Sequence, residues 1–142
     1  MIRTRNIDPA ARDSTVISRS LPTNGECVDQ CIFIATRKCE VVEISEVHSV
    51  AGNDASAVNL QVTKDTGTNA PGAGTDLLTN NTNAGFNMKG TANTVQTGSL
   101  VSSKTTKRLD VGDRLSLDFA GTLTTLAGVV VTVRIRFYES AA

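Results

Sequence analysis

Hydrophobic and polar positions alternate most clearly in two adjacent stretches near the C-terminus, residues 114–119 and 129–138. In the first stretch, Leu115, Leu117 and Phe119 share one side of an extended chain. In the second, one side comprises Val129, Val131, Val133, Ile135 and Phe137, and the other comprises Val130, Thr132, Arg134, Arg136 and Tyr138. A period of two is typical of strands that bury one face. We therefore predict two neighbouring strands here.

Three further strands are predicted in the first half of the chain. Residues 31–35 form a continuous apolar run, which is typical of a strand buried on both faces. Residues 40–50 follow as a second strand, and we expect a β-bulge near Ser45 and Glu46 because the apolar positions change parity there. Residues 58–63 alternate again, which predicts a third strand with its valines and leucine inward and its polar side chains outward.

A long polar segment, residues 64–98, separates these strands from the C-terminal pair. Its predicted apolar anchors are Leu77, Leu78, Phe86, Met88 and Val95. Within and after it we expect a helical turn at residues 75–78, a short strand at 84–88 and another strand at 100–107. A loop of this length is unusual in a compact domain and is often functional.

Composition supports an all-β chain. Hydrophobic residues make up 39% of the sequence and aromatic residues only 4%, so the core must consist mainly of aliphatic side chains. About seven or eight strands, few helices and no alternation of strands with helices predict one β-sandwich, jelly-roll-like, over residues 26–142. A small closed barrel is the second choice.

The N-terminal residues 1–25 have a different pattern. Arginines, prolines and isolated apolar residues show no sustained period, and residues 8–13 could form one helical turn. The segment is either a frayed terminus or an extended arm that binds a neighbouring molecule, and its scattered aliphatic residues favour the arm. The candidate contact residues in this arm are Ile2, Arg3, Arg5, Ile7, Arg12, Val16, Ile17 and Arg19.

The sequence offers little for catalysis. His48 beside Glu46 could act as a general base or metal ligand, but no second histidine and no nucleophile motif accompanies it. We interpret it as an ordinary strand residue. Cys27, Cys31 and Cys39 lack the paired spacing of a zinc site and are odd in number, so we expect free, buried thiols. We predict no enzyme, metal or cofactor.

Charge and hydropathy limit the partners. Fourteen basic residues balance fourteen acidic ones, and only five aromatic residues are present, which disfavours nucleic-acid binding. No apolar run is long enough to span a bilayer, and no secretory signal is evident, so we expect synthesis in a reducing cytoplasm. The predicted arm, the long loop and the mixed outer face with Arg134, Arg136 and Tyr138 instead favour a binding or structural protein.

Residues 108–119, followed by 121–133, resemble the C-terminal part of small proteins of tailed bacteriophages that are encoded near the major capsid protein. These are capsid decoration (cement) or head auxiliary proteins; residues 58–63 and 65–67 match more loosely. The resemblance implies a β-sandwich on the outside of an assembled head. It would bind the major capsid protein, often as a trimer, and hold neighbouring capsid subunits together. The expected location is the exterior of the virion, after synthesis in the host cytoplasm.

Two alternatives remain at this point. One is a virion appendage, such as a head fibre, tail or receptor-binding domain that recognises a host surface glycan. It would need aromatic side chains to stack on sugars, and three of the four phenylalanines are assigned to strands. The other is a cellular carbohydrate-binding or assembly sandwich unrelated to phage.

Overall fold

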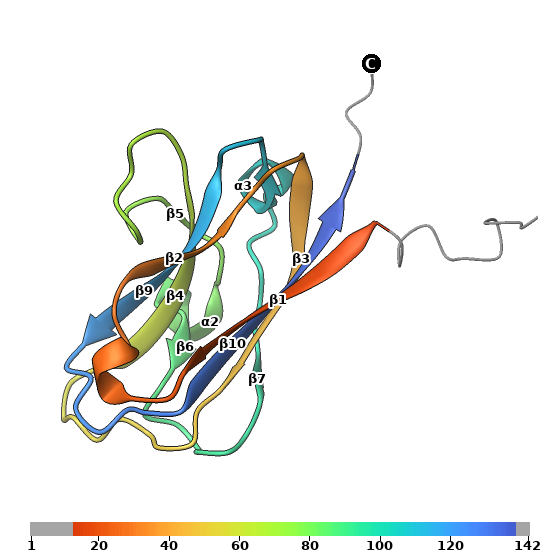
Figure 1. Ribbon diagram of the computed structural model, residues 1–142. Coiled ribbons are helices and arrows are strands. Elements are labelled where there is room, and N and C mark those ends of the chain that lie inside the picture. The colour runs from red at the N-terminus through yellow and green to blue at the C-terminus, as the bar shows by residue number, and fades with distance from the viewer. Residues whose placement is uncertain (1–12, 139–142) are drawn as a thin grey trace, which may run out of the picture.

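Two antiparallel sheets pack face to face in the computed structural model, which describes residues 13–138 (Figure 1). Sheet A contains β1 (Ser14–Leu21), β10 (Val129–Phe137), β3 (Cys39–Val47), β7 (Gln96–Thr97) and β8 (Arg108–Leu109). Sheet B contains β2 (Gln30–Ile34), β9 (Arg114–Gly121), β4 (Val58–Asp65), β5 (Thr75–Asp76) and β6 (Phe86–Asn87). The helices are single turns: η2 (Asn24–Glu26), α2 (Asn80–Asn83) and α3 (Lys104–Lys107). The predicted all-β sandwich is confirmed.

The strand pairing is nested along the chain. The first strand pairs with the last, β1 with β10; then β2 pairs with β9, β3 with β8, and β4 with β5. This is the pairing of one long hairpin rolled into two layers, which is the jelly-roll arrangement. The sheets remain separate at β1 and β2, so the molecule is a sandwich and not a closed barrel.

The core lies where the predicted inward faces meet. Val133 of β10 lies between Ile17 of β1 and Ile44 of β3 in the sheet A register, and Val133 and Ile44 are completely buried. In sheet B, Leu117 pairs with Val62, and both are also completely buried. The two C-terminal strands predicted from alternation are therefore confirmed.

The predicted bulge in β3 exists but lies elsewhere. Arg134 pairs with Glu43, whereas the next residue of β10, Ile135, pairs with Val41. Val42 is therefore the extra residue, and the predicted position near Ser45 and Glu46 was wrong. Glu46 points inward and is buried although it is charged, so the apolar residues of β3 alone do not mark its inward positions.

Two predictions of exposure were inverted. β2, predicted as buried on both faces, is the edge strand of sheet B, and its Ile34 is 59% exposed. Conversely, the polar residues of β4 were predicted to face solvent, yet Gln61 is only 3% exposed because the long loop covers it. The Gln61 side chain forms hydrogen bonds with both backbone polar groups of Leu78 in that loop. Its Nε2 donates to the carbonyl of Leu78 and its Oε1 accepts from the N–H of Leu78, both at 2.9 Å.

The long loop is anchored largely as predicted. Leu77, Leu78, Phe86 and Met88 are completely buried, but Val95 is 65% exposed. The expected strand at residues 84–88 is β6, whereas the helical turn expected at 75–78 is β5. The strand expected at 100–107 is wrong: the helical turn α3 occupies its second half. Ser103 caps this turn, since the N–H of Thr106 donates to its Oγ at 3.2 Å.

The N-terminal prediction needs the largest correction. Residues 14–21, expected to belong to an extended arm over 1–25, form β1, which pairs with β10 along its whole length. The sandwich therefore begins at Ser14 and not at residue 26. Serine, threonine and arginine in β1 obscure the alternation that places Ile17 and Leu21 toward the core. Residues 1–12, including most of the predicted helical turn, lie outside the described residues.

Candidate interaction surface

The outer surface of sheet A is the most extensive regular surface that the predicted contact residues share. It consists of side chains on β1, β10 and β3 that point away from the core. We call it the sheet A face; its members are Val16, Ser18, Ser20, Val130, Thr132, Arg134, Arg136, Glu40, Glu43, Ser45 and Val47. The register arranges them in rows across the three strands.

One row combines an exposed apolar residue with a pair of opposite charges. Val16, Arg134 and Glu43 are neighbours on β1, β10 and β3, and Val16 is 54% exposed. Directly opposed residues in an antiparallel pair have close Cβ atoms, so the carboxylate and guanidinium lie within reach of each other. Pairing of β1 with β10 thus brings predicted contact residues from both ends of the chain together.

The next row forms an ion-pair network. Glu40 accepts from Nε of Arg108 at 3.0 Å and from Nη2 of Arg136 at 3.3 Å. The guanidinium of Arg108 also lies 4.7 Å from the ring centroid of Tyr138. One largely buried carboxylate therefore forms ion pairs with two half-exposed arginines, which leaves excess positive charge at this end of the face. The contact with Arg108 also holds the aromatic ring of Tyr138 in place.

The other rows are uncharged. Ser18, Thr132 and Ser45 share one row, and Val130 lies opposite Val47 in another. These rows present small hydroxyl and valine side chains. The arginines beside these rows are a residue type enriched at protein interfaces, whereas the serines are a depleted type.

Two predicted contact residues do not join this face. Ile17 and Arg19 have the opposite parity in β1, where they pair with the inward-facing Val133 and Val131. Ile17 packs against the core, and Arg19 is exposed at the strand edge. Ile2, Arg3, Arg5, Ile7 and Arg12 lie outside the described residues.

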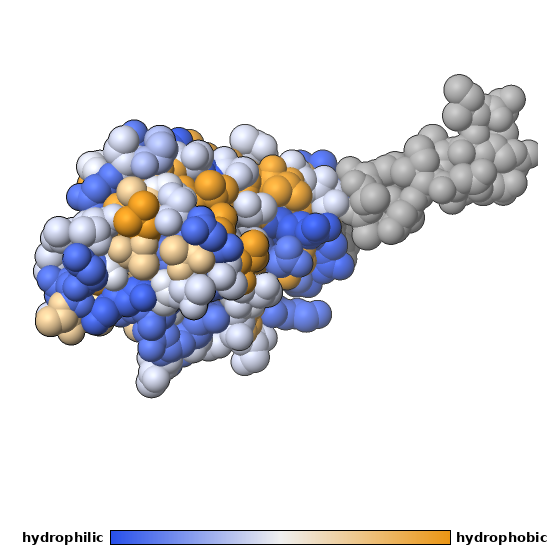
Figure 2. Space-filling view, turned by 90° about the horizontal axis from the view of Figure 1, so that it is seen from below, coloured by the Kyte–Doolittle hydropathy of each residue, from blue (hydrophilic) through white to orange (hydrophobic). Residues whose placement is uncertain are grey.

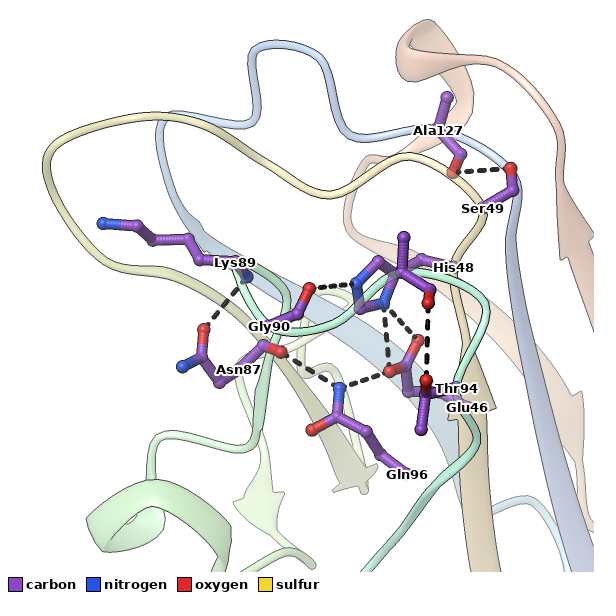
Figure 3. Close-up of polar contacts among 10 residues, drawn as sticks. Glu46, His48, Ser49, Asn87, Lys89, Gly90, Thr94, Gln96 and Ala127 are labelled. Carbon is purple, nitrogen blue, oxygen red and sulfur yellow. Dashed lines mark hydrogen bonds and ion pairs between the residues drawn. The ribbon is translucent and has the colours of Figure 1, made fainter.

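A buried polar network lies at the end of β3 (Figure 3). Glu46 and His48 both have completely buried side chains, and Nδ1 of His48 lies 3.2 Å from each carboxylate oxygen of Glu46. Nε2 of His48 lies 3.1 Å from the carbonyl oxygen of Gly90. Gln96 donates through Nε2 to Glu46 and, at 3.0 Å, to the carbonyl of Asn87.

The protonation of this network follows from its geometry. A carbonyl oxygen only accepts, so Nε2 of His48 carries a hydrogen and donates to Gly90. The contact between Nδ1 of His48 and Glu46 is then a hydrogen bond in either of two states. Either a protonated Glu46 donates to Nδ1, or a doubly protonated ring donates to the carboxylate. Burial raises the pKa of the Glu46 carboxyl, whereas the hydrogen bonds from Gln96 and His48 act in the opposite direction. The net direction is a raised pKa of the Glu46 carboxyl, with burial as its largest cause.

This pair has a structural role. Both ring nitrogens of His48 are occupied by protein atoms, and the ring has no exposed surface from which it could reach a substrate. The pair fastens residues 87–96 to β3. The sequence interpretation of His48 as an ordinary strand residue missed this network, whose only signal was a glutamate and a histidine two residues apart.

Acidic side chains gather on the outer surface of sheet B. The pKa of Asp118 is raised by burial and then by the nearby carboxylates of Asp29, Asp76 and Asp65. Asp65 itself is fully engaged: it accepts from Thr63 Oγ1 and Gly74 N at 2.9 Å and from Gly72 N at 3.3 Å. Between residues 13 and 138, no group of three or more acidic, histidine or cysteine side chains is placed to hold a metal ion.

The cysteines are free, as predicted, but the prediction that all three are buried is wrong for Cys31. Cys27 and Cys39 are buried, and Cys31 is partly exposed on edge strand β2. Burial raises the pKa of the Cys39 thiol to about 11. A thiol with a raised pKa is a poor nucleophile, so this residue contributes packing and not reactivity.

The loop end of the sandwich offers a weaker candidate surface. Val28, Val50 and Val95, which are 52%, 47% and 65% exposed, belong to the connections η2–β2, β3–β4 and β6–β7. The β3–β4 connection runs along the lower end of the sandwich in Figure 1. Figure 2 views this end directly and shows several apolar patches separated by polar residues. Such scattered exposure is ordinary for a protein surface.

Comparison with protein families, curated proteins and solved structures finds no significant match to this chain. No helix within residues 13–138 is both long enough and apolar enough to cross a membrane.

Proposed function

We propose that this protein is a structural virion protein that binds the outside of a tailed-phage capsid and stabilises neighbouring major capsid protein subunits through the sheet A face. One observation supports this most: pairing of β1 with β10 gathers Val16, Arg134 and Arg136 on one exposed surface. The segment that resembles decoration proteins, residues 108–133, also contributes β9 and part of β10.

The chemistry of the sheet A face suits a protein partner. Val16, Val130 and Val47 supply apolar area, which stabilises a complex by about 25 cal/mol per Å² removed from water. Arg134 and Arg136 can form paired hydrogen bonds with carboxylates of a capsid subunit. The translational and rotational freedom lost on association offsets much of this gain. Binding at many equivalent sites on a shell therefore suits a cementing role.

A glycan-binding appendage receives less support. Sugar recognition by stacking needs exposed aromatic faces, but Phe86 is completely buried and the other three phenylalanines are only partly exposed. Tyr138 carries the Arg108 guanidinium over its ring. The jelly-roll fold itself decides nothing here, because it occurs in both capsid proteins and lectins.

The test is co-sedimentation of the purified protein with preassembled phage heads that lack it. We expect saturable binding at a fixed copy number per capsomer. Arg134→Glu should lose most of this binding, because it reverses a charge in the middle of the face. Arg19→Glu is the matched control: it reverses the same charge on adjacent β1, off the face, and should bind normally. Absence of wild-type binding, or equal binding by both variants, would contradict the proposal.

A further inference from the structure

β1 forms the only long, regular edge of the sandwich among the described residues. On one side, the sheets end in strands of two residues, such as β5 and β7. On the other side, β2 has five residues and its register shifts between Cys31 and Phe33. β1 has eight residues, pairs with β10 without any shift, and contains no proline and a single charge, Arg19. Proteins ordinarily interrupt or charge such edges, so an uninterrupted one indicates a strand-pairing surface.

The hydrogen bonds at the end of β1 show which of its residues direct their backbone N–H and C=O groups toward β10 and which direct them outward. Phe137 donates its N–H to the carbonyl of Asp13, and the next residue, Tyr138, donates to Lys38 beside β3. Odd-numbered residues of β10 therefore bond to β1. Because backbone groups alternate along a strand, the odd-numbered residues of β1 bond to β10, and Val16, Ser18 and Ser20 direct their N–H and C=O groups outward. No other described strand pairs with this edge.

We propose that β1 of one molecule pairs antiparallel with β1 of a second copy, about a two-fold axis at Ile17. In this register Val16 lies opposite the second copy's Ser18, so residues with outward backbone groups meet each other. Pairing must join residues on the same face, which requires even positions to meet even positions. A register centred on Ile17 meets this requirement.

The side chains agree with this register. Arg19 lies opposite the second copy's Thr15, so no like charges oppose each other across the axis. The two Ile17 side chains form the central pair, of the non-hydrogen-bonded kind that brings side chains closest. Ile17 is only partly buried in the single molecule, and this contact covers it. The formal net charge is zero, so no bulk repulsion separates two copies.

A second copy suits the edge better than an unrelated strand does. Two copies pair the outward backbone groups of Val16 and Ser18 on both molecules in one contact, whereas a foreign strand must bring an unpaired edge of its own. The resulting assembly is a dimer with one continuous sheet formed from both A sheets. It differs from the trimer that the family resemblance implies, and it does not depend on capsid binding.

Sedimentation velocity of the full chain over a concentration series tests the dimer. We expect wild type to sediment as a dimer, and Ser18→Lys to weaken self-association by about tenfold or more, because it places cations on both sides of the axis. Ser45→Lys is the control, since Ser45 occupies the same row of the sheet but lies on β3, away from the edge. It should remain dimeric, and circular dichroism checks that each variant is folded.

Cross-linking tests the register independently of the lysine variants. Ile17→Cys, treated with a mild oxidant, should form a disulfide-linked dimer that a reducing agent separates, because the central pair brings two Cβ atoms close together. Wild type, with its own three cysteines, is the control. A monomeric or trimeric wild type, equal loss of the dimer in both lysine variants, or no cross-link through position 17 would overturn the proposal.

Discussion

His48 lies 3.2 Å, through Nδ1, from both carboxylate oxygens of Glu46, and neither side chain has any exposed surface. Glu46 lies at the end of β3 and His48 is the first residue after it, so the strand alternation continues by one position and points both toward the interior. The sandwich thus contains a polar pair at positions where its pattern would place apolar side chains. His48 contacts Gly90 and Glu46 contacts Gln96, and these contacts hold residues 87–96 against the sheet.

The raised pKa of Glu46 predicts a pH dependence of stability. Burial raises this pKa above its ordinary value of 4.5, so the folded state holds a proton that the unfolded state has already lost. The resulting stabilisation is complete below pH 4.5 and is lost as the pH rises through the raised value. We expect the free energy of unfolding of wild type, relative to Glu46→Gln, to fall as the pH increases across this range.

Urea denaturation at a series of pH values measures this difference. Glu46→Gln is the suitable reference because a glutamine can still accept from Gln96 and donate to Nδ1 of His48, without a titrating group. A difference that stays constant with pH would contradict a raised pKa. A difference that grows with pH would mean that the folded state stabilises the ionised carboxylate.

Strong alternation predicts the strands of this fold, whereas the exposure of several residues depends on tertiary contacts that alternation does not reveal. β9 and β10 were found because their inward positions are uniformly apolar. β1 was missed because its inward side includes a threonine and an arginine, a pattern that resembles a disordered segment. The burial of Gln61 depends on a loop that folds back from residues 77–83, and no local pattern in β4 records that contact.

The candidate surface was predicted only in part, for a similar reason. Arg134 and Arg136 were assigned to an outer face from alternation within β10 alone, and the structure places them there. The neighbour relation between Val16 and Arg134 depends on pairing between residues more than a hundred positions apart. Such long-range pairing leaves no periodic signal, so the predicted arm included residues that belong to the sheet.

A charge at Val133 should prevent folding. Val133 is completely buried between Ile17 and Ile44, so Val133→Asp places a carboxylate in the core without a partner. We expect a loss of about 4 kcal/mol or more, which approaches the total stability of a small domain. Thr132→Asp is the control: it adds the same group one residue earlier, on the sheet A face, and should remain folded. Circular dichroism and thermal melting compare the two; equal stability would mean that the two faces of β10 are inverted.

Removal of the Asp65 carboxylate should loosen the turn that follows β4. This buried side chain accepts hydrogen bonds from Thr63, Gly72 and Gly74, so Asp65→Ala leaves three donors without their acceptor. We expect a loss of about 2–3 kcal/mol of stability and faster proteolysis within residues 66–74. Asp65→Asn retains one acceptor oxygen and should lose less. Equal protease resistance in wild type and Asp65→Ala would show that the turn does not depend on this carboxylate.

Truncation of the N-terminus separates binding from folding. Removal of residues 1–12 leaves every described strand in place but deletes five predicted contact residues: Ile2, Arg3, Arg5, Ile7 and Arg12. We expect a folded protein with unchanged thermal stability and weaker binding to phage heads. Removal of residues 1–20, which an arm over the whole segment would tolerate, instead deletes most of β1 and uncovers the edge of β10. That longer truncation should be insoluble or strongly destabilised.

Co-sedimentation with heads and thermal melting, carried out on both truncations, distinguish the two effects. Undiminished binding after removal of residues 1–12 would exclude them from the contact and leave the sheet A face as the binding surface. Normal stability after removal of residues 1–20 would contradict the role of β1 in the sandwich, because Val133 and Val131 would then lose their neighbours Ile17 and Arg19 without consequence. The shorter truncation therefore tests the contact, and the longer one tests the fold.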